Sequence, residues 1–135
     1  MKEIAKIVLI NGKNEFLFQL RDEDPNIIFP GQWALIGGGI EKDENPLKGL
    51  LREIEEEIPD CKVFDVKYLE SFFYNPAKTK NFLFKGNINE EIEYINKKLT
   101  EGQKVGYFEF NELGNIKLNY VERDFIYKNK DLIMN

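Results

Sequence analysis

The chain has 135 residues, of which 24 are acidic and 19 are basic, so its formal net charge is −5. This balance argues against a protein that coats nucleic acid polymers, because that role needs a basic face. The sequence has no histidine, which excludes imidazole catalysis and imidazole metal ligands, and its single cysteine, Cys61, excludes an internal disulfide. With no long apolar segment and no paired cysteines, we expect a cytoplasmic protein without a membrane partner.

The predicted elements mix strands and helices along what we expect to be one domain, residues 1–135. Runs rich in β-branched and aromatic residues predict strands over residues 4–10, 15–21, 32–37, 62–74, 79–86 and 104–110. Helices are predicted over residues 46–58 and 119–130, and we interpret residues 87–100 as a loop. Strands with two separated helices predict an α/β fold in which helices cover both faces of a sheet.

The helix predicted at residues 46–58 has two distinct faces. At about 100° per residue, one stripe is aliphatic, and we expect it to be the core face: Leu47, Leu50, Leu51, Ile54 and Ile58. Glu53, Glu56 and Glu57 form a second stripe beside it, and Arg52 lies just beyond them. Because like charges at this spacing repel each other, these carboxylates either face water or hold something positive.

Clustered carboxylates suit a hard divalent cation, because Mg²⁺ is held by a few carboxylates together with phosphate oxygens and water. The alternative is a solvated acidic face, which is the usual role of a run of charges. The flanking residues favour the cation site. The glycines at 37–39 allow the backbone to approach a ligand closely. Glu41 and Glu44 lie in the loop that leads to the helix, and Pro46 suits its first turn.

The spacing of these residues resembles the Nudix hydrolase box, G-x5-E-x7-R-E-U-x-E-E-x-G-U, where U is a bulky aliphatic residue. The following positions match in register: Gly38, Glu44, Arg52, Glu53, Ile54, Glu56 and Glu57. The end of the box departs, because Pro59 replaces the glycine and Asp60 replaces the last aliphatic residue. A glycine there would end the helix at positive φ, which proline cannot adopt, so we expect the helix to end by another route.

The resemblance to this MutT-like family implies an α/β/α sandwich with a mixed sheet between helices. It implies hydrolysis, dependent on Mg²⁺ or Mn²⁺, of a diphosphate linkage in a nucleoside diphosphate derivative. The substrate it favours is a nucleoside triphosphate, oxidised ones included, cleaved to the monophosphate and pyrophosphate. The implied partner is therefore a small nucleotide, with no nucleic acid polymer and no membrane, and the expected assembly is a monomer or a homodimer. The alternative is a Nudix-like module that binds a nucleotide or a partner without turnover.

The same resemblance implies roles for the box residues. Glu53, Glu56 and Glu57 match carboxylates that hold metals or orient water, and Gly37 matches a backbone carbonyl ligand. Arg52 matches the arginine that pairs with the first glutamate and takes part in catalysis with it. The structural positions of the box are filled by Gly38 and Glu44. Loss of the box carboxylates would favour the binding module, and none is lost.

Residues outside the box carry weaker signals. Glu101 resembles the acidic residue that a second loop brings to the metals, where it would act as a catalytic residue and metal ligand; its alternative is an ordinary loop glutamate. Arg21 resembles a phosphate-contacting arginine, and its alternative is a surface ion pair. Phe29, Trp33 and Tyr74 could stack on a base or could belong to the core or the rim of the site.

Overall fold

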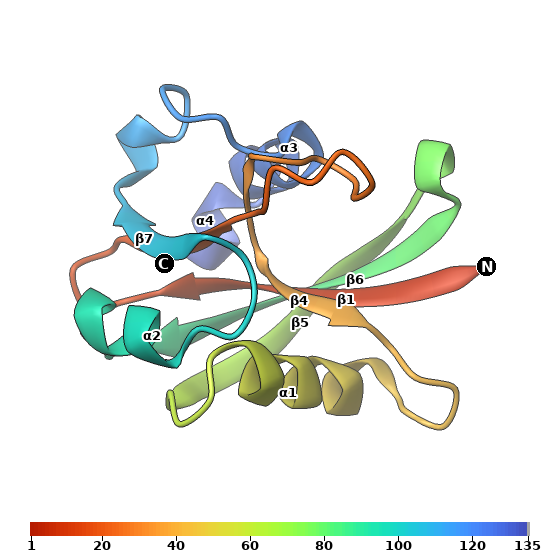
Figure 1. Cartoon of the computed structure of the whole chain (residues 1–135), viewed down its shortest axis with the longest axis horizontal. Helices are drawn as coiled ribbons and strands as arrows, with labels where there is room; N and C mark the ends of the chain where they lie inside the picture. The colour runs from red at the N-terminus through yellow and green to blue at the C-terminus, as the bar shows by residue number, and fades with distance from the viewer. Residues whose placement is uncertain (135) are drawn as a thin grey trace.

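The computed structural model describes residues 1–134 as a seven-stranded sheet between helices (Figure 1). The strands are β1 (Lys2–Ile10), β2 (Phe16–Leu20), β3 (Trp33–Ala34), β4 (Ile36–Gly39), β5 (Val63–Tyr74), β6 (Thr79–Ile88) and β7 (Lys104–Phe108). The helices are α1 (Pro46–Glu57), α2 (Ile92–Lys98), α3 (Tyr120–Lys128) and α4 (Lys130–Ile133). None of the described helices is long and apolar enough to cross a membrane.

Strand β1 organises the sheet. The main path runs β3-β2-β1-β6-β5, while β4 also pairs with β1 and β7 pairs with β2. The pairing of β1 with β6 is parallel, with Ile4 opposite Asn81, and β1 pairs with β2 and β4 in antiparallel fashion. The sheet is therefore mixed, as expected.

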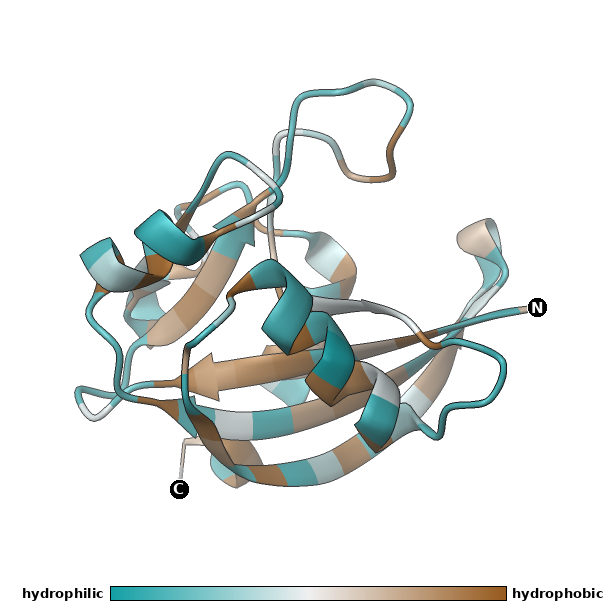
Figure 2. Ribbon diagram, turned by 60° about the horizontal axis from the view of Figure 1, so that its bottom comes forward, coloured by the Kyte–Doolittle hydropathy of each residue, from teal (hydrophilic) through white to brown (hydrophobic). Residues whose placement is uncertain are grey.

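The side chains of β1 alternate between two cores. Ala5, Ile7 and Leu9 belong to one buried cluster, and Val8 and Ile10 belong to the other. The first cluster also contains side chains of α1 and α2, and the second contains side chains of α3 and α4. Figure 2 shows hydrophobic β1 behind α1, whose visible side is mostly hydrophilic. This arrangement confirms an α/β fold with helices on both faces of the sheet.

The core face of α1 is narrower than its periodicity predicts. Leu50, Ile54 and Ile58 are buried, but the side chains of Leu47 and Leu51 are 45% and 47% exposed, so their assignment to the core was wrong. Leu47 lines a shallow, open groove between α1 and strands β5 and β6. Periodicity shows on which side of a helix apolar residues lie, but it does not show how far the sheet extends beneath them.

The interpretation of residues 87–100 as a loop was also wrong, because Ile92–Lys98 form α2. Ile95 is fully buried, and Ile92 and Leu99 pack against the same core. The predicted strand at 32–37 is interrupted at Leu35, which separates β3 from β4. The predicted C-terminal helix at 119–130 is divided at Asn129 into α3 and α4.

Candidate active site

The glycines before α1 make room for other groups. Gly37 has a φ of +144°, and a Cβ on it would lie 2.1 Å from the carbonyl oxygen of Ala5 in β1. A Cβ on Gly38 would lie 2.5 Å from Oε2 of Glu53. Side chains at either position would therefore displace β4 from β1 or the Glu53 carboxylate from its place. The glycines fix where the start of the box meets the acidic helix.

The loop before α1 is organised by side-chain caps. Asn45 is the N-cap residue, and its Oδ1 accepts from the backbone N–H of Lys48 at 2.8 Å. Pro46 occupies the first turn, as predicted. Glu44 accepts from the backbone N–H of Glu41 at 2.9 Å. These contacts hold Glu44 in the position from which it meets Arg52.

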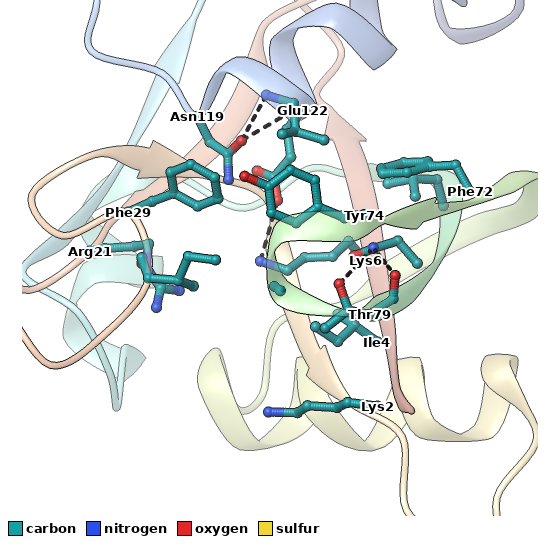
Figure 3. Close-up of a pocket in the computed structure, with 15 residues that line it drawn as sticks. Lys2, Ile4, Lys6, Arg21, Phe29, Phe72, Tyr74, Thr79, Asn119 and Glu122 are labelled. Atoms are coloured by element: carbon teal, nitrogen blue, oxygen red, sulfur yellow. Dashed lines mark hydrogen bonds and ion pairs between the residues drawn. The ribbon is translucent and has the colours of Figure 1, made fainter.

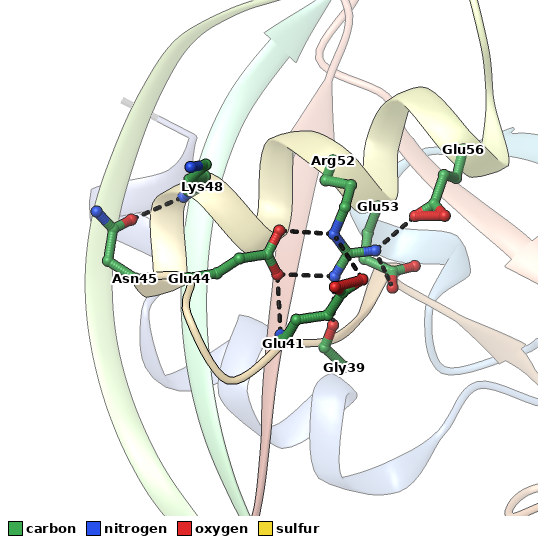
Figure 4. Close-up of polar contacts among 8 residues, drawn as sticks. All are labelled: Gly39, Glu41, Glu44, Asn45, Lys48, Arg52, Glu53 and Glu56. Carbon is green, nitrogen blue, oxygen red and sulfur yellow. Dashed lines mark hydrogen bonds and ion pairs between the residues drawn. The ribbon is translucent and has the colours of Figure 1, made fainter.

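Arg52 is the centre of an ionic network (Figure 4). Its Nε and Nη2 donate to the two carboxylate oxygens of Glu44 at 2.6 and 2.9 Å, and Nη2 also donates to the carbonyl oxygen of Gly39 at 2.8 Å. Its Nη1 donates to Glu53 at 3.1 Å and to Glu56 at 2.5 Å. The paired contact with Arg52 lowers the pKa of Glu44 to about 2, and the Arg52 pKa is raised in turn. The box arginine thus orients two of the three metal-binding carboxylates predicted on the helix.

Glu57 is the most buried carboxylate of the site. It is only 2% exposed, and its Oε2 has no hydrogen-bond partner among the described residues. Burial raises the pKa of Glu57 to about 8, the positive charge of Lys6 opposes this rise, and the charges of Glu101 and Glu53 reinforce it. A carboxylate in this setting is costly unless a positive charge compensates for it.

The end of α1 explains how the altered box keeps Glu57 in place. The helix ends at Glu57, and Ile58 leaves the helical region at a φ of −130°, which the following Pro59 favours. The positive φ that a glycine would adopt falls instead on Asp60, at 62°. The helix therefore ends by another route, as predicted, and Glu57 stays in its last turn.

A second loop brings Glu101 to this end of the helix. The backbone N–H of Thr100 donates to the carbonyl of Glu57 at 3.0 Å, and Nε2 of Gln19 donates to the carbonyl of Glu101 at 2.7 Å. Gly102 has a φ of +78°, and a Cβ there would lie 2.8 Å from the carbonyl oxygen of Leu20. The Glu101 side chain is exposed, and its charge contributes to the raised pKa of Glu57.

These residues fit a bound cation. The buried Oε2 of Glu57, unpartnered within residues 1–134, and its acidic neighbours Glu53 and Glu101 supply oxygen ligands whose negative charge Lys6 and Arg52 offset only in part. Within residues 1–134, no three acidic or cysteine side chains already lie close enough together to form a complete metal-binding group. Arg52 holds the carboxylates of Glu53 and Glu56, so the approach of a cation would compete with these ion pairs.

A cavity of about 260 Å³ opens on the other side of β1 (Figure 3). Phe29 and Tyr74 line it, whereas Trp33 is absent from its lining and packs against Phe108, with ring centroids 4.8 Å apart. Arg21 lines this cavity and also a neighbouring hollow of about 340 Å³ that contains Glu101. Its Nε donates to the carbonyl of Ile28 at 2.9 Å. Arg21 therefore lies between the cavity and the second acidic loop.

The sequence reasoning missed three charged residues that line this cavity, Lys2, Lys6 and Glu122, and the last two form a pair. Nζ of Lys6 lies 3.4 Å from Oε2 of Glu122, and both side chains are largely buried. Oε1 of Glu122 accepts from the backbone N–H of Leu35 at 2.7 Å. A lysine inside the otherwise apolar run IAKIVLI was the one available signal, because such a charge needs a partner when the strand is central.

These features define the class of Nudix-fold proteins: a mixed sheet lies between helices, and α1, which follows the glycines of β4, carries Arg52 and three glutamates. The sequence model for the NUDIX domain matches residues 2–128, so the chain belongs to this family of hydrolases, whose members act on nucleoside diphosphate linkages. The nucleoside triphosphatase NudI of Escherichia fergusonii is 54% identical over 37 residues, which are 27% of this chain and 26% of that protein. The match thus spans about a quarter of the length of that curated relative.

Solved structures resemble the whole fold. The MutT protein from Methanosarcina mazei Go1 is 24% identical, with a TM-score of 0.76 over 96% of this chain and 93% of that chain. A mutT/nudix family protein from Listeria innocua is 18% identical, with a TM-score of 0.73 over 97% of this chain and 92% of that chain. At these identities the likeness concerns the fold, and it confirms the predicted sandwich architecture.

Proposed function

We propose that this chain is a metal-dependent pyrophosphohydrolase that cleaves a nucleoside triphosphate into the monophosphate and pyrophosphate. The observation that carries the proposal is the buried Oε2 of Glu57, which has no hydrogen-bond partner within residues 1–134 and has Glu53 and Glu101 as acidic neighbours. A bound divalent cation would compensate the negative charge that Lys6 and Arg52 leave uncompensated. The local similarity to nucleoside triphosphatase NudI supports the substrate class.

Mg²⁺ or Mn²⁺ would be held by Glu53, Glu56, Glu57 and Glu101 together with the carbonyl oxygen of Gly37. Such an ion, when bound, neutralises phosphate oxygens and lowers the pKa of a coordinated water. This explains how an acidic protein binds an anionic substrate, since the carboxylates attract cations and the cations attract phosphates.

The protein groups supply positioning and proton transfer. Arg52 fixes Glu53 through Nη1, so Glu53 orients the attacking water and accepts its proton. Arg21 lies between the cavity and the Glu101 loop, where its guanidinium binds the phosphate chain. The cavity accepts the nucleoside, and the rings of Phe29 and Tyr74 offer it apolar faces.

The test is a substrate screen with purified protein in Mg²⁺ and in Mn²⁺, using ordinary and oxidised nucleoside triphosphates, nucleotide sugars and dinucleoside polyphosphates. Pyrophosphate and nucleoside monophosphate in equal amounts are the expected products. The Glu57→Gln variant should still bind the best substrate but lose turnover. Nucleotide binding without any turnover by the wild type would instead identify a binding module.

A further inference from the structure

Strands β2 and β7 meet next to the hollow that contains Arg21 and Glu101. Their ladder reaches Leu20 opposite Lys104, and the backbone N–H of Gln103 donates to the carbonyl of Leu20 at 2.8 Å. Arg21 directly follows β2, and Glu101 lies in the loop that leads from α2 into β7. The two residues are therefore carried by neighbouring segments of antiparallel strands.

Each of these segments supplies a glutamine that holds the other. Nε2 of Gln19, in β2, donates to the backbone carbonyl of Glu101 at 2.7 Å. Nε2 of Gln103, in the loop before β7, donates to the backbone carbonyl of Arg21 at 2.9 Å. We call Gln19 and Gln103 the crossed glutamines. Because each bond ends on a backbone carbonyl, it restrains the main chain of Glu101 or Arg21 and leaves the charged group of that residue free for a ligand.

The contact made by Gln19 is closely packed. Gln19 is only 5% exposed, and a buried amide is costly without hydrogen-bond partners. Gly102 lies against it, because a Cβ at that position would be 2.9 Å from Nε2 of Gln19. A larger residue at position 102 would therefore displace the amide. The bond to Glu101 thus restrains the loop at the residue that carries the carboxylate.

Arg21 has two further restraints, and both come from the loop between β2 and β3. Its backbone N–H donates to the carbonyl of Gln32 at 2.9 Å, and its Nε donates to the carbonyl of Ile28 at 2.9 Å. The bond from Gln103 reaches Arg21 from the opposite segment. Among these contacts, the one from Gln103 therefore connects the arginine to the acidic loop.

We propose that the crossed glutamines are positioning residues with separate effects. Gln19 sets where Glu101 meets the bound cation. Gln103 sets where Arg21 meets the phosphate chain of the substrate. Neither role requires the glutamine to contact the cation or the phosphates. This inference rests on the proposed function, because that function gives Glu101 and Arg21 their ligands.

A purely structural role makes a different prediction. If the glutamines only joined the loop to the strand, loss of either one would lower stability and would weaken cation binding and nucleotide binding together. A neutral hydrogen bond is worth roughly a 2- to 10-fold difference in an equilibrium. The decisive observation is therefore which affinity changes in which variant, because loss of stability alone does not separate the two.

The variants Gln19→Met and Gln103→Met each remove one bond, because methionine has nearly the length of glutamine but no N–H donor. Binding of Mn²⁺ without nucleotide is measured from the electron paramagnetic resonance signal of the free ion. Binding of a nucleoside triphosphate analogue with a methylene bridge between its α- and β-phosphorus atoms is measured by calorimetry in saturating Mg²⁺. Gln19→Met should weaken Mn²⁺ binding roughly 2- to 10-fold and leave the analogue affinity unchanged. Gln103→Met should weaken the analogue by a similar factor and leave Mn²⁺ binding unchanged.

Gln32→Met is the matched control. It makes the same change next to Arg21, keeps the backbone bond to it, and lies outside the linings of the cavity and the hollow, so both affinities should stay at the wild-type values. Double variants test whether each glutamine acts through its partner. Gln19→Met should not further weaken Mn²⁺ binding once Glu101 is replaced with glutamine. Gln103→Met should not further weaken the analogue once Arg21 is replaced with alanine.

Gln19→Asn covers the case in which Gln19→Met does not fold, because it keeps a polar amide beside the hollow and shortens its reach by one carbon. It should weaken Mn²⁺ binding in the same way. Unchanged affinities, equal losses of both affinities in both variants, or additive losses in the double variants would overturn the inference and leave pyrophosphohydrolysis intact. Selective loss of Mn²⁺ binding in the Gln19 variants, with no hydrolysis of any triphosphate by the wild type, would support the positioning of Glu101 and overturn the proposed function.

Discussion

The hydroxyl of Thr100 donates to the backbone carbonyl of Glu56 at 2.6 Å. The backbone N–H of the same residue donates to the carbonyl of Glu57 at 3.0 Å, so two otherwise unpaired carbonyls at the end of α1 are satisfied. Through these bonds the loop that carries Glu101 is attached to the helix that carries the other glutamates. Together with the bond from Gln19 to Glu101, this exposed threonine therefore sets the relative position of the two sets of carboxylates.

Replacing Thr100 with valine should reduce turnover, because removing the hydroxyl loosens the attachment of the Glu101 loop. A displacement of about 1 Å in a catalytic group can cost up to ~100-fold in rate. Initial rates measure the effect on turnover, and thermal melts measure the effect on stability. The melting temperature should change little because Thr100 is exposed. Thr100→Ser is the control and should keep the wild-type rate. Wild-type turnover by the valine variant would show that the hydrogen bond from the Thr100 hydroxyl to Glu56 is not needed for activity.

Activity should require a divalent cation, because the carboxylates of the site repel an anionic substrate when nothing positive lies between them. Dialysis against a chelator should abolish hydrolysis, and added Mg²⁺ or Mn²⁺ should restore it. Rates are measured after dialysis and again after titration with each ion. Full activity in rigorously metal-free buffer would refute the mechanism.

Glu57→Gln should change how the stability of the metal-free protein depends on pH. The pKa of Glu57 rises from 4.5 to about 8, so between these values the folded protein binds a proton that the unfolded chain releases. Wild-type stability should therefore fall as pH rises through this window, and the variant should lack this part of the fall. Thermal melts in chelator from pH 5 to pH 9 measure the difference. Parallel profiles for the two proteins would contradict the prediction.

The same substitution should reduce turnover in Mg²⁺ by orders of magnitude, since it removes a buried ligand for the cation. Glu101→Gln should also lower turnover while leaving the fold intact. Rates and circular dichroism spectra of both variants provide the measurement. A folded Glu101→Gln protein with the wild-type rate would return Glu101 to the role of an ordinary loop residue.

Glu44→Gln should lower the free energy of unfolding more above pH 5 than at pH 2.5. Arg52 and the N–H of Glu41 lower the pKa of Glu44 to about 2, so its contribution to stability is present above pH 4.5 and is lost as pH falls towards 2. Thermal melts across this range measure the loss, and the variant should also turn over more slowly because Arg52 loses its anchor. Glu55→Gln, an exposed change on the same helix, is the control and should leave both properties unchanged.

Two neighbouring leucines of α1 should differ sharply in their contribution to stability. Leu50→Ala should cost about 2–5 kcal/mol of unfolding free energy, because Leu50 is fully buried. Leu51→Ala should cost less than about 1 kcal/mol, because its side chain is 47% exposed. Urea denaturation in chelator measures both values. Equal costs would mean that something covers Leu51 in solution.

Local sequence signals predicted the acidic helix, its first turn and most of the strands well. Each of these features depends on residues close together in the chain, such as Asn45 with Lys48 or Pro46 at the helix start. The helix at Ile92–Lys98 was missed although Ile92, Ile95 and Leu99 have helical spacing, because the segment is short and rich in charge. The single-domain organisation, the cytoplasmic location and the monomeric or dimeric state stay predictions.

The contacts between distant residues could not be predicted. Lys6 and Glu122 are 116 positions apart, and only the packing of α3 over the sheet brings them together. The exposure of Leu47 and the burial of Glu57 likewise depend on neighbours from other elements. The metal-binding role of the box residues was inferred from resemblance and stays a proposal, whereas their clustering around Arg52 is a feature of the structure.

The replaced end of the box is held by α2. The hydroxyl of Tyr94 donates to the backbone carbonyl of Asp60 at 3.1 Å, and Nζ of Lys98 pairs with the Asp60 carboxylate at 3.3 Å. A turn that a flexible glycine would make alone is here made by a residue with partners on a second helix. Pro59 and Asp60 therefore form a unit with Tyr94 and Lys98, and restoring glycine at position 59 would not by itself restore an independent turn. In relatives that carry this variant ending, we expect the four positions to change together rather than one at a time.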